Sequence, residues 1–174
     1  MSLDPAGVRS RTLILLLVAK LTPYIANANF NSQQLESLCD QWINLSAFNA
    51  RCIQSGVLDR YEGACMHPLY EIPQGLEKDH PLGVMRDCFI TVAMQYILLA
   101  GGKIYHQIVE KSVKGSEAKE QGLSKWKLWI ERLKEVAERE DTKLELGRAA
   151  CEAYFKMVSM HCAAIAELGE PDFT

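Results

Sequence analysis

The stretch LGVMRDCFITVAMQYILLAGGKIYHQIVEK, residues 82–111, decides the fold of this chain. Its bulky apolar side chains recur three, four or seven positions apart, which is the spacing of one face of an α-helix: Ile90, Met94, Ile97, Ile104 and Ile108. Asp87 and Tyr105 fall at the border of this face. A helix that is apolar over most of its surface is usually buried. We therefore expect residues 82–111 to form a core helix.

The rest of the chain reads as further helices around it. Asp4-Pro5 can start a first helix that Pro23 ends, and Asn31 with Gln34 three positions later is a capping-box pattern. A third expected helix has to stop or kink near Pro68. With a loop at 72–83 and a polar connection before Ser124, the expected helices cover roughly residues 4–22, 31–56, 58–71, 82–111, from 124 onward, and 142–168. No segment shows the alternation of apolar and polar residues that would indicate a β-strand instead of a helix. The prediction is an all-α, single-domain bundle of about six helices over residues 1–174.

Composition narrows the classes of function. The chain has 174 residues, 48% of them hydrophobic, and a formal net charge of −3. This gives no basic footprint for nucleic acid or an anionic membrane surface, so we expect neither as a partner. GGK at 101–103 lacks the rest of a phosphate-binding loop, and His106 with Glu110 lacks a third metal ligand. We expect no cofactor and no metal.

The six cysteines are scattered, without C-x-x-C pairs, and are expected to be buried thiols rather than a disulfide framework. The N-terminal segment VRSRTLILLLVAK, residues 8–20, followed by ANANF at 26–30, also resembles a signal peptide. Lys20 and Pro23 lie between the apolar run and the supposed cleavage site. A cytoplasmic protein is therefore the favoured prediction, and secretion the alternative.

His161 is the leading catalytic candidate. On the last helix it shares the apolar face with Tyr154 and Met157, so it is expected to point into the core. It can be a neutral core histidine bonded to Tyr154. It can instead be a general acid or base that lines a pocket.

Two further polar features need partners. A half-buried Asp87 requires a cation or a hydrogen bond, and Arg51 is a plausible source. The stretch QWINLSAFNARC, residues 41–52, together with Asp40 just before it, carries a polar line of Asp40, Asn44 and Arg51 on a helix that is otherwise apolar. We expect this line to abut another helix, a subunit or a ligand cavity. It is either a structural network that fixes helix register or a pocket wall in which Arg51 holds an oxygen anion.

QWINLSAFNARC resembles the W-x-N-L-x-A-F-x-A-R signature of a family of small helical fungal proteins of unassigned function. Residues 123–138, LSKWKLWIERLKEVAE, and 92–106, VAMQYILLAGGKIYH, are similar to later segments of that family. The resemblance covers about residues 32–168. Some members are encoded in secondary-metabolite gene clusters, such as one for oxopyrrolidines. The resemblance therefore implies a role in fungal natural-product biosynthesis.

Together these features suggest a cofactor-independent cyclase or isomerase that acts on a polyketide-like or amide-containing ligand in an apolar pocket. His161 would be the base, with Asp87 or Tyr154 as its proton partner. The expected substrate-binding residues are Asn44, Arg51, Phe48, Trp42 and Tyr105. The alternative is a non-catalytic protein that binds a small molecule or assembles as a homodimer. A cavity of about 300 Å³ or more between the second, fourth and sixth helices would separate the two.

Overall fold

The computed structural model describes residues 31–57, 66–110 and 116–168, and this part of the chain contains helices and no strand. In chain order the elements are α2 (Ser32–Gln54), α3 (Met66–Leu76), α4 (Val84–Tyr105), the short π-helix η1 (His106–Glu110), α5 (Ser116–Glu138) and α6 (Leu144–Leu168). The prediction of an all-α fold is confirmed. The first predicted helix, residues 4–22, and the signal-like segment lie outside the described residues.

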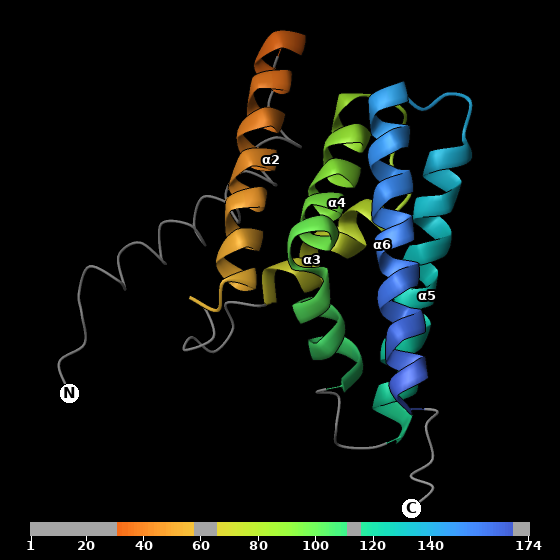
Figure 1. Ribbon diagram of the computed structural model, residues 1–174. Coiled ribbons are helices and arrows are strands. Elements are labelled where there is room, and N and C mark those ends of the chain that lie inside the picture. The colour runs from red at the N-terminus through yellow and green to blue at the C-terminus, as the bar shows by residue number, and fades with distance from the viewer. Residues whose placement is uncertain (1–30, 58–65, 111–115, 169–174) are drawn as a thin grey trace, which may run out of the picture.

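Helix α4 is the centre of the bundle. It packs against α2, α3 and α6, while α5 packs against α6 and η1. Figure 1 shows α2, α4 and α6 running in the same direction and α5 running in the opposite one. The five isoleucine and methionine side chains predicted to face the core are all buried. Residues 84–109 are long and apolar enough to cross a membrane, but 67% of their most apolar window is buried inside the protein, as expected for a central helix.

Helix α2 begins where its capping residues predict. The Asn31 side chain accepts a hydrogen bond from the backbone N–H of Gln34, and the Gln34 side chain accepts one from the backbone N–H of Asn31. This reciprocal pair satisfies two of the N–H groups that a helix start leaves without partners. The prediction of a capping box is confirmed.

Helix α3 differs from the prediction. It begins at Met66, so Pro68 lies in the first turn, where its missing N–H costs nothing. The helix continues through Pro73 to Leu76, into the segment that we expected to be a loop. Ile72 and Leu76 are buried one turn apart. This burial outweighs the local preference of proline and glycine for a loop.

Helix α5 begins at Ser116, eight residues before the predicted cap at Ser124. The segment expected to be a polar connection is rich in strong helix formers, namely glutamate, alanine, lysine and glutamine. Gly122 lies against η1, where a Cβ would come within 2.3 Å of the carbonyl oxygen of Ile108. Contact with η1 explains why this polar segment is helical.

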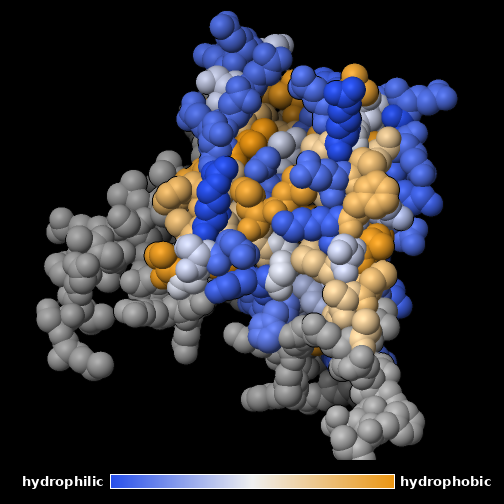
Figure 2. Space-filling model, viewed as in Figure 1, coloured by the Kyte–Doolittle hydropathy of each residue, from blue (hydrophilic) through white to orange (hydrophobic). Residues whose placement is uncertain are grey.

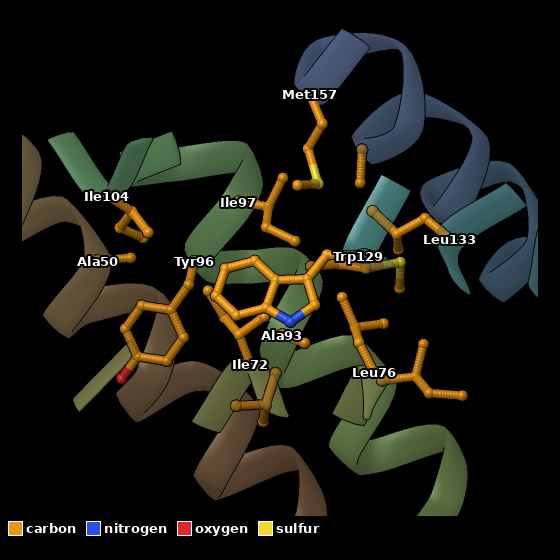
Figure 3. Close-up of a cluster of buried hydrophobic side chains, with 14 of the residues drawn as sticks. Ala50, Ile72, Leu76, Ala93, Tyr96, Ile97, Ile104, Trp129, Leu133 and Met157 are labelled. Atoms are coloured by element: carbon orange, nitrogen blue, oxygen red, sulfur yellow. The ribbon is translucent and has the colours of Figure 1, made fainter. Parts of the chain in front are cut away.

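Aromatic side chains from three helices fill the interior. Trp42 of α2 and Trp126 and Trp129 of α5 are fully buried. Figure 3 shows the indole of Trp129 lying among side chains of α4, α5 and α3, including Ile97, Leu133 and Ile72. Its Nε1 donates to Oε1 of Glu77 at 2.7 Å. The space between α3, α4, α5 and α6 is thus occupied by packed side chains.

Candidate functional site

A surface cleft lies between α2 and the first half of α4, beside the segment that leads into α6. Its volume is about 270 Å³, just under the roughly 300 Å³ at the lower end of small-molecule sites. It is lined by acidic, apolar and thiol side chains and one lysine: Glu36, Cys39, Asp40, Ile43, Val84, Asp87, Cys88, Thr91 and Lys143. Figure 2 shows hydrophobic surface between the hydrophilic edges contributed by the neighbouring helices. The cleft is more polar than the pocket expected from the sequence.

Asp87 lies at this cleft and is half-buried, as predicted. Its carboxylate pairs with Nζ of Lys143 at 2.9 Å, so Lys143 and not Arg51 is its cation. The nearby carboxylate raises the pKa of Lys143. Because the lysine is largely exposed, the pair contributes less than about 1 kcal/mol to stability. The sequence prediction failed here because Lys143 precedes α6, and its position across from the start of α4 depends on the fold.

A group of buried polar side chains lies where α2, α3 and α4 meet. Nδ2 of Asn49 donates to the phenolic oxygen of Tyr96 at 3.1 Å, and both side chains are buried. Burial raises the pKa of Tyr96 to about 12, the hydrogen bond from Asn49 opposes this rise, and the charge of Glu71 adds to it. The phenol therefore stays protonated at any physiological pH.

Glu71 of α3 is the ionisable member of this group. Only 6% of the residue is exposed. Its Oε2 has no hydrogen-bond partner among the described residues. Burial alone raises the pKa of its carboxyl to about 7. A carboxyl that is half-ionised near neutral pH is unusual in a helical core, because an unpaired buried charge is costly.

Two donors on α2 complete the group. Nε1 of Trp42 and Oγ of Ser46 are buried, and neither makes a hydrogen bond of normal geometry within the described chain. They lie one turn apart, on the side of α2 that carries Asn49. We call Trp42, Ser46, Asn49, Glu71 and Tyr96 the buried polar cluster. The charge of Glu71 also contributes to raising the pKa of Cys88. Cys88 lines the cleft, whereas no member of the cluster does.

His161 is part of a different group. Its Nδ1 lies 3.3 Å from the hydroxyl of Tyr105, whose ring packs edge-on against Trp126. Burial, and secondarily the charge of Lys127, lowers the pKa of His161, while burial raises that of Tyr105. The structure thus brings together one predicted catalytic residue and one predicted binding residue.

Tyr154 does not fill the place expected for it beside His161. Its ring packs against Phe155 at a centroid distance of 5.2 Å, and Tyr105 takes the role of hydrogen-bond partner to His161. The 100° helical wheel put Tyr154 on the same face as His161. Helix α4 supplies the nearer hydroxyl, which a single-helix projection does not show.

Asp87 and His161 cannot act on the same substrate atoms. Helices α4 and α6 run in parallel, with Asp87 near Lys143 at one end and Tyr105 near His161 at the other. At 1.5 Å per residue, the 18 residues from Asp87 to Tyr105 place about 27 Å between them. This distance excludes Asp87 as the proton partner of His161, and the alternative partner Tyr154 stays a prediction.

The polar line on α2 faces outward. Asn44 and Arg51 are exposed, and Phe48 between them is 52% exposed. Within the described part of the chain, α2 packs chiefly against α4, so its opposite side has no helix to contact. Asp40 lines the cleft, whereas Asn44 and Arg51 are exposed, so the expected contact of these two residues with a subunit stays a prediction. Trp42, also predicted to bind substrate, is fully buried instead.

Sequence reasoning missed Glu71, and a signal for it exists. Residues 68, 71, 72, 75 and 76 of α3 are all buried, at the spacing of one helical face. Had the segment been read as a helix through its two prolines, Glu71 would have appeared as a lone carboxyl on an apolar face.

Comparison with known proteins identifies a family but no function. A family described as "Protein of unknown function (DUF3632)" matches residues 16–133, which is more than half of the chain. No curated protein and no solved structure matches this chain. The matched region includes α2, α3, α4 and most of α5, and hence the whole buried polar cluster. The chain belongs to the DUF3632 family of proteins of unknown function.

Proposed function

We propose that the protein binds a small organic molecule at the cleft between α2 and α4 and transfers a proton on it without a cofactor, as a cyclase or isomerase. The observation that carries this proposal is Glu71, a buried carboxyl with no partner for its Oε2 within the described chain and a pKa of about 7. A group with this pKa can both accept and return a proton near neutral pH.

A structural role explains Glu71 poorly. Its neighbours on the buried face of α3 include Ile72 and Leu76, and an apolar side chain at position 71 would avoid the cost of desolvating a carboxyl. Buried carboxylates that serve structure are normally paired with a cation or several donors. Among the described residues the Oε2 of Glu71 has no hydrogen-bond partner, which favours a chemical role.

The neighbouring donors suit an oxygen that gains negative charge. The phenolic oxygen of Tyr96 accepts from Asn49, Ser46 lies beside it, and we propose that the phenolic hydrogen turns to a ligand oxygen. Trp42 and Ser46 offer one further donor each. Donors placed where charge develops stabilise an enolate or similar anion. The arrangement favours a substrate with an enolisable carbonyl, in which Glu71 removes the hydrogen from the adjacent carbon.

The cleft is the proposed entrance. Cys88 lines it and is also within the electrostatic influence of Glu71. A substrate seated in the cleft would need the side chains of this wall to move in order to reach the cluster. Trp42, one of the signature residues, belongs to the cluster. We therefore propose that it binds the substrate.

The resemblance to fungal proteins from secondary-metabolite clusters supplies the substrate class. We propose a polyketide-like or amide-containing intermediate, processed in the cytoplasm of a fungal cell. Ring closure and double-bond shifts in such compounds proceed through enolates, which need proton transfer and enclosure rather than an electron carrier.

Deuterium exchange tests proton transfer without knowledge of the product. The full chain is incubated in D₂O with a panel of ketones and amides whose α-hydrogens exchange slowly on their own, and mass spectrometry follows exchange. We expect acceleration of at least one compound, and a loss of about 10²- to 10⁴-fold in Glu71→Gln. Glu138→Gln, at the exposed end of α5, is the matched control. Equal acceleration by Glu71→Gln would contradict the proposal.

The same assay separates Glu71 from the acid–base group predicted first. His161 with Tyr105 lies at the far end of α4 from the cleft. If Glu71 transfers the proton, His161→Ala retains the exchange activity. If His161→Ala loses it and Glu71→Gln does not, the original assignment of His161 as the base is the correct one.

A second candidate, assembly as a homodimer, rests on the outer face of α2. The signature residues Asn44, Phe48 and Arg51 are exposed there, and Phe48 is a large apolar side chain. Light scattering after size-exclusion chromatography tests it. A dimer that Phe48→Asp converts to a monomer supports assembly, whereas a wild-type protein that is already monomeric rules it out.

A further inference from the structure

Two cysteines from different helices meet at the cleft. The sulfur of Cys88 in α4 lies 3.8 Å from the backbone oxygen of Cys39 in α2, to which its thiol donates. Both residues line the cleft, although each is at most 4% exposed. They are 49 positions apart in the sequence, so their contact is a product of the fold.

We propose that Cys39 and Cys88 are a redox-active pair that a hydroperoxide converts to a disulfide linking α2 to α4. Peroxide reaches sulfur through the cleft, which is wide enough for a molecule of this size. A disulfide brings the sulfurs to about 2 Å. Because Cys88 already lies against the backbone of Cys39, the link would join residues that the fold has placed side by side. The inference does not depend on the proposed function.

The two thiols are suited to different steps. The hydrogen bond from Cys88 lowers the pKa of Cys39, an effect that outweighs burial and the charges of Asp40 and Glu36. The pKa of Cys88 is raised, first because of its bond with Cys39 and then because of burial. We therefore assign Cys39 as the attacking cysteine and Cys88 as the resolving one, because the thiolate is the nucleophile and the lower pKa favours it at position 39.

The chemistry balances with one hydroperoxide. The Cys39 thiolate attacks the outer oxygen of hydrogen peroxide, the O–O bond breaks, and hydroxide leaves as Cys39 becomes a sulfenic acid. The Cys88 sulfur then attacks the Cys39 sulfur, the S–OH bond breaks, and water leaves with the thiol proton. Two thiols are oxidised by two electrons, and one peroxide is reduced to two waters.

The other described cysteines lack this arrangement. Cys52 and Cys151 are partly exposed, Cys162 is exposed, and within the described part of the chain no disulfide joins any two of these three. Met85 is the other sulfur near the pair, 3.9 Å from the thiol of Cys39. A methionine cannot form a disulfide, so the selective product is the link between residues 39 and 88.

Peptide mapping of the full chain tests the inference. The protein is treated with hydrogen peroxide, quenched, unfolded in the presence of N-ethylmaleimide, digested and analysed by mass spectrometry. We expect loss of the Cys39 and Cys88 thiols together, a linked peptide two hydrogens lighter than the separate peptides, and its disappearance with dithiothreitol. Oxidation confined to the other cysteines, with both of these thiols alkylated, would overturn the proposal.

Variants separate the two steps. In Cys88→Ser we expect Cys39 to accumulate as a sulfenic acid that dimedone traps, and in Cys39→Ser neither dimedone adduct nor linked peptide at position 88. Cys162→Ser is the matched control and should form the link at the wild-type rate. A link that forms equally fast in urea-unfolded protein would show that the fold does not direct it, and would also overturn the proposal. The mapping of wild-type protein stands even if a variant fails to fold.

Discussion

At the scale of single residues, two asparagines on one helix show how position decides the role of a polar side chain. Asn49 is buried and bonded to Tyr96, whereas Asn44 is exposed. We predict that Asn49→Ala lowers the free energy of unfolding by about 1–3 kcal/mol, because the Tyr96 phenol loses its buried partner. Asn44→Ala, the matched control, should change it by no more than about 0.5 kcal/mol. Urea denaturation measures both, and equal effects would contradict the buried pair.

His161 provides a second residue-scale prediction. Its imidazole is expected to titrate below the ordinary histidine value of 6.5, because burial and the charge of Lys127 disfavour the protonated ring. NMR of the ring protons against pH measures this pKa. Lys127→Ala should raise it only slightly, since burial is the larger cause. A wild-type value at or above 6.5 would show that the ring is solvated or has an anionic partner.

The sequence predicts which side chains are buried better than it predicts their partners. The apolar face of α4 and the burial of Asp87 follow from helical spacing alone. The pairing of Asp87 with Lys143, and of His161 with Tyr105, depends on which helices are neighbours and on their relative direction. No periodicity within one segment contains that information.

At the scale of the element, two glycines in helices test why α4 and α5 are built as they are. A Cβ at Gly122 would meet the backbone of Ile108 at 2.3 Å, whereas nothing lies within 4 Å of one at Gly102. We predict that Gly122→Ala destabilises the protein by about 1–3 kcal/mol through overpacking. Gly102→Ala should stabilise it by about 0.5–1 kcal/mol through helix propensity. Thermal unfolding followed by circular dichroism compares them, and a stabilising Gly122→Ala would mean that α5 and η1 are less close than described.

A helix boundary could be predicted where a capping residue sets it. It could not be predicted where contacts with other helices set it. The reciprocal bonds of Asn31 and Gln34 are local, so the start of α2 could be predicted. Helix α3 passes through Pro73 because its buried face contacts α4, and the first turns of α5 are helical beside η1. Such contacts join segments far apart in the sequence. This explains why the end of α3 and the start of α5 were not predicted.

At the scale of the whole molecule, the buried polar cluster should make stability depend on pH. The pKa of the Glu71 carboxyl is about 7 in the folded protein, above the 4.5 expected in the unfolded chain. Between these values the folded state holds a proton that the unfolded state has released, so the free energy of unfolding falls as pH rises. This decrease in the free energy of unfolding is absent below pH 4.5 and complete above pH 7, and its full size is on the order of 3 kcal/mol.

Glu71→Gln removes the titrating group, so its unfolding free energy should lack this decrease between pH 4.5 and 7. Urea denaturation at several pH values measures wild type and variant together, with Glu138→Gln as the exposed control. A decrease of the same size in Glu71→Gln would assign the pH dependence to another group.

The all-α architecture of the bundle could be predicted from the sequence, but the position of the candidate site could not. Helical periodicity and capping residues predict the helices, while the junction of α2, α3 and α4 is created only when three separate segments pack together. That junction buries the carboxyl of Glu71, whose Oε2 has no hydrogen-bond partner among the described residues, and the proposed function depends on the proton that this carboxyl carries.

Titration of that carboxyl by carbon-13 NMR is the most direct test. With glutamate side-chain carboxyl carbons labelled, the Glu71 resonance is identified by its absence in Glu71→Gln and followed across the pH range. The account predicts a midpoint near 7, well above the range of the exposed glutamates. A midpoint near 4.5 would show that the carboxyl is solvated or paired, and would contradict the proposed site.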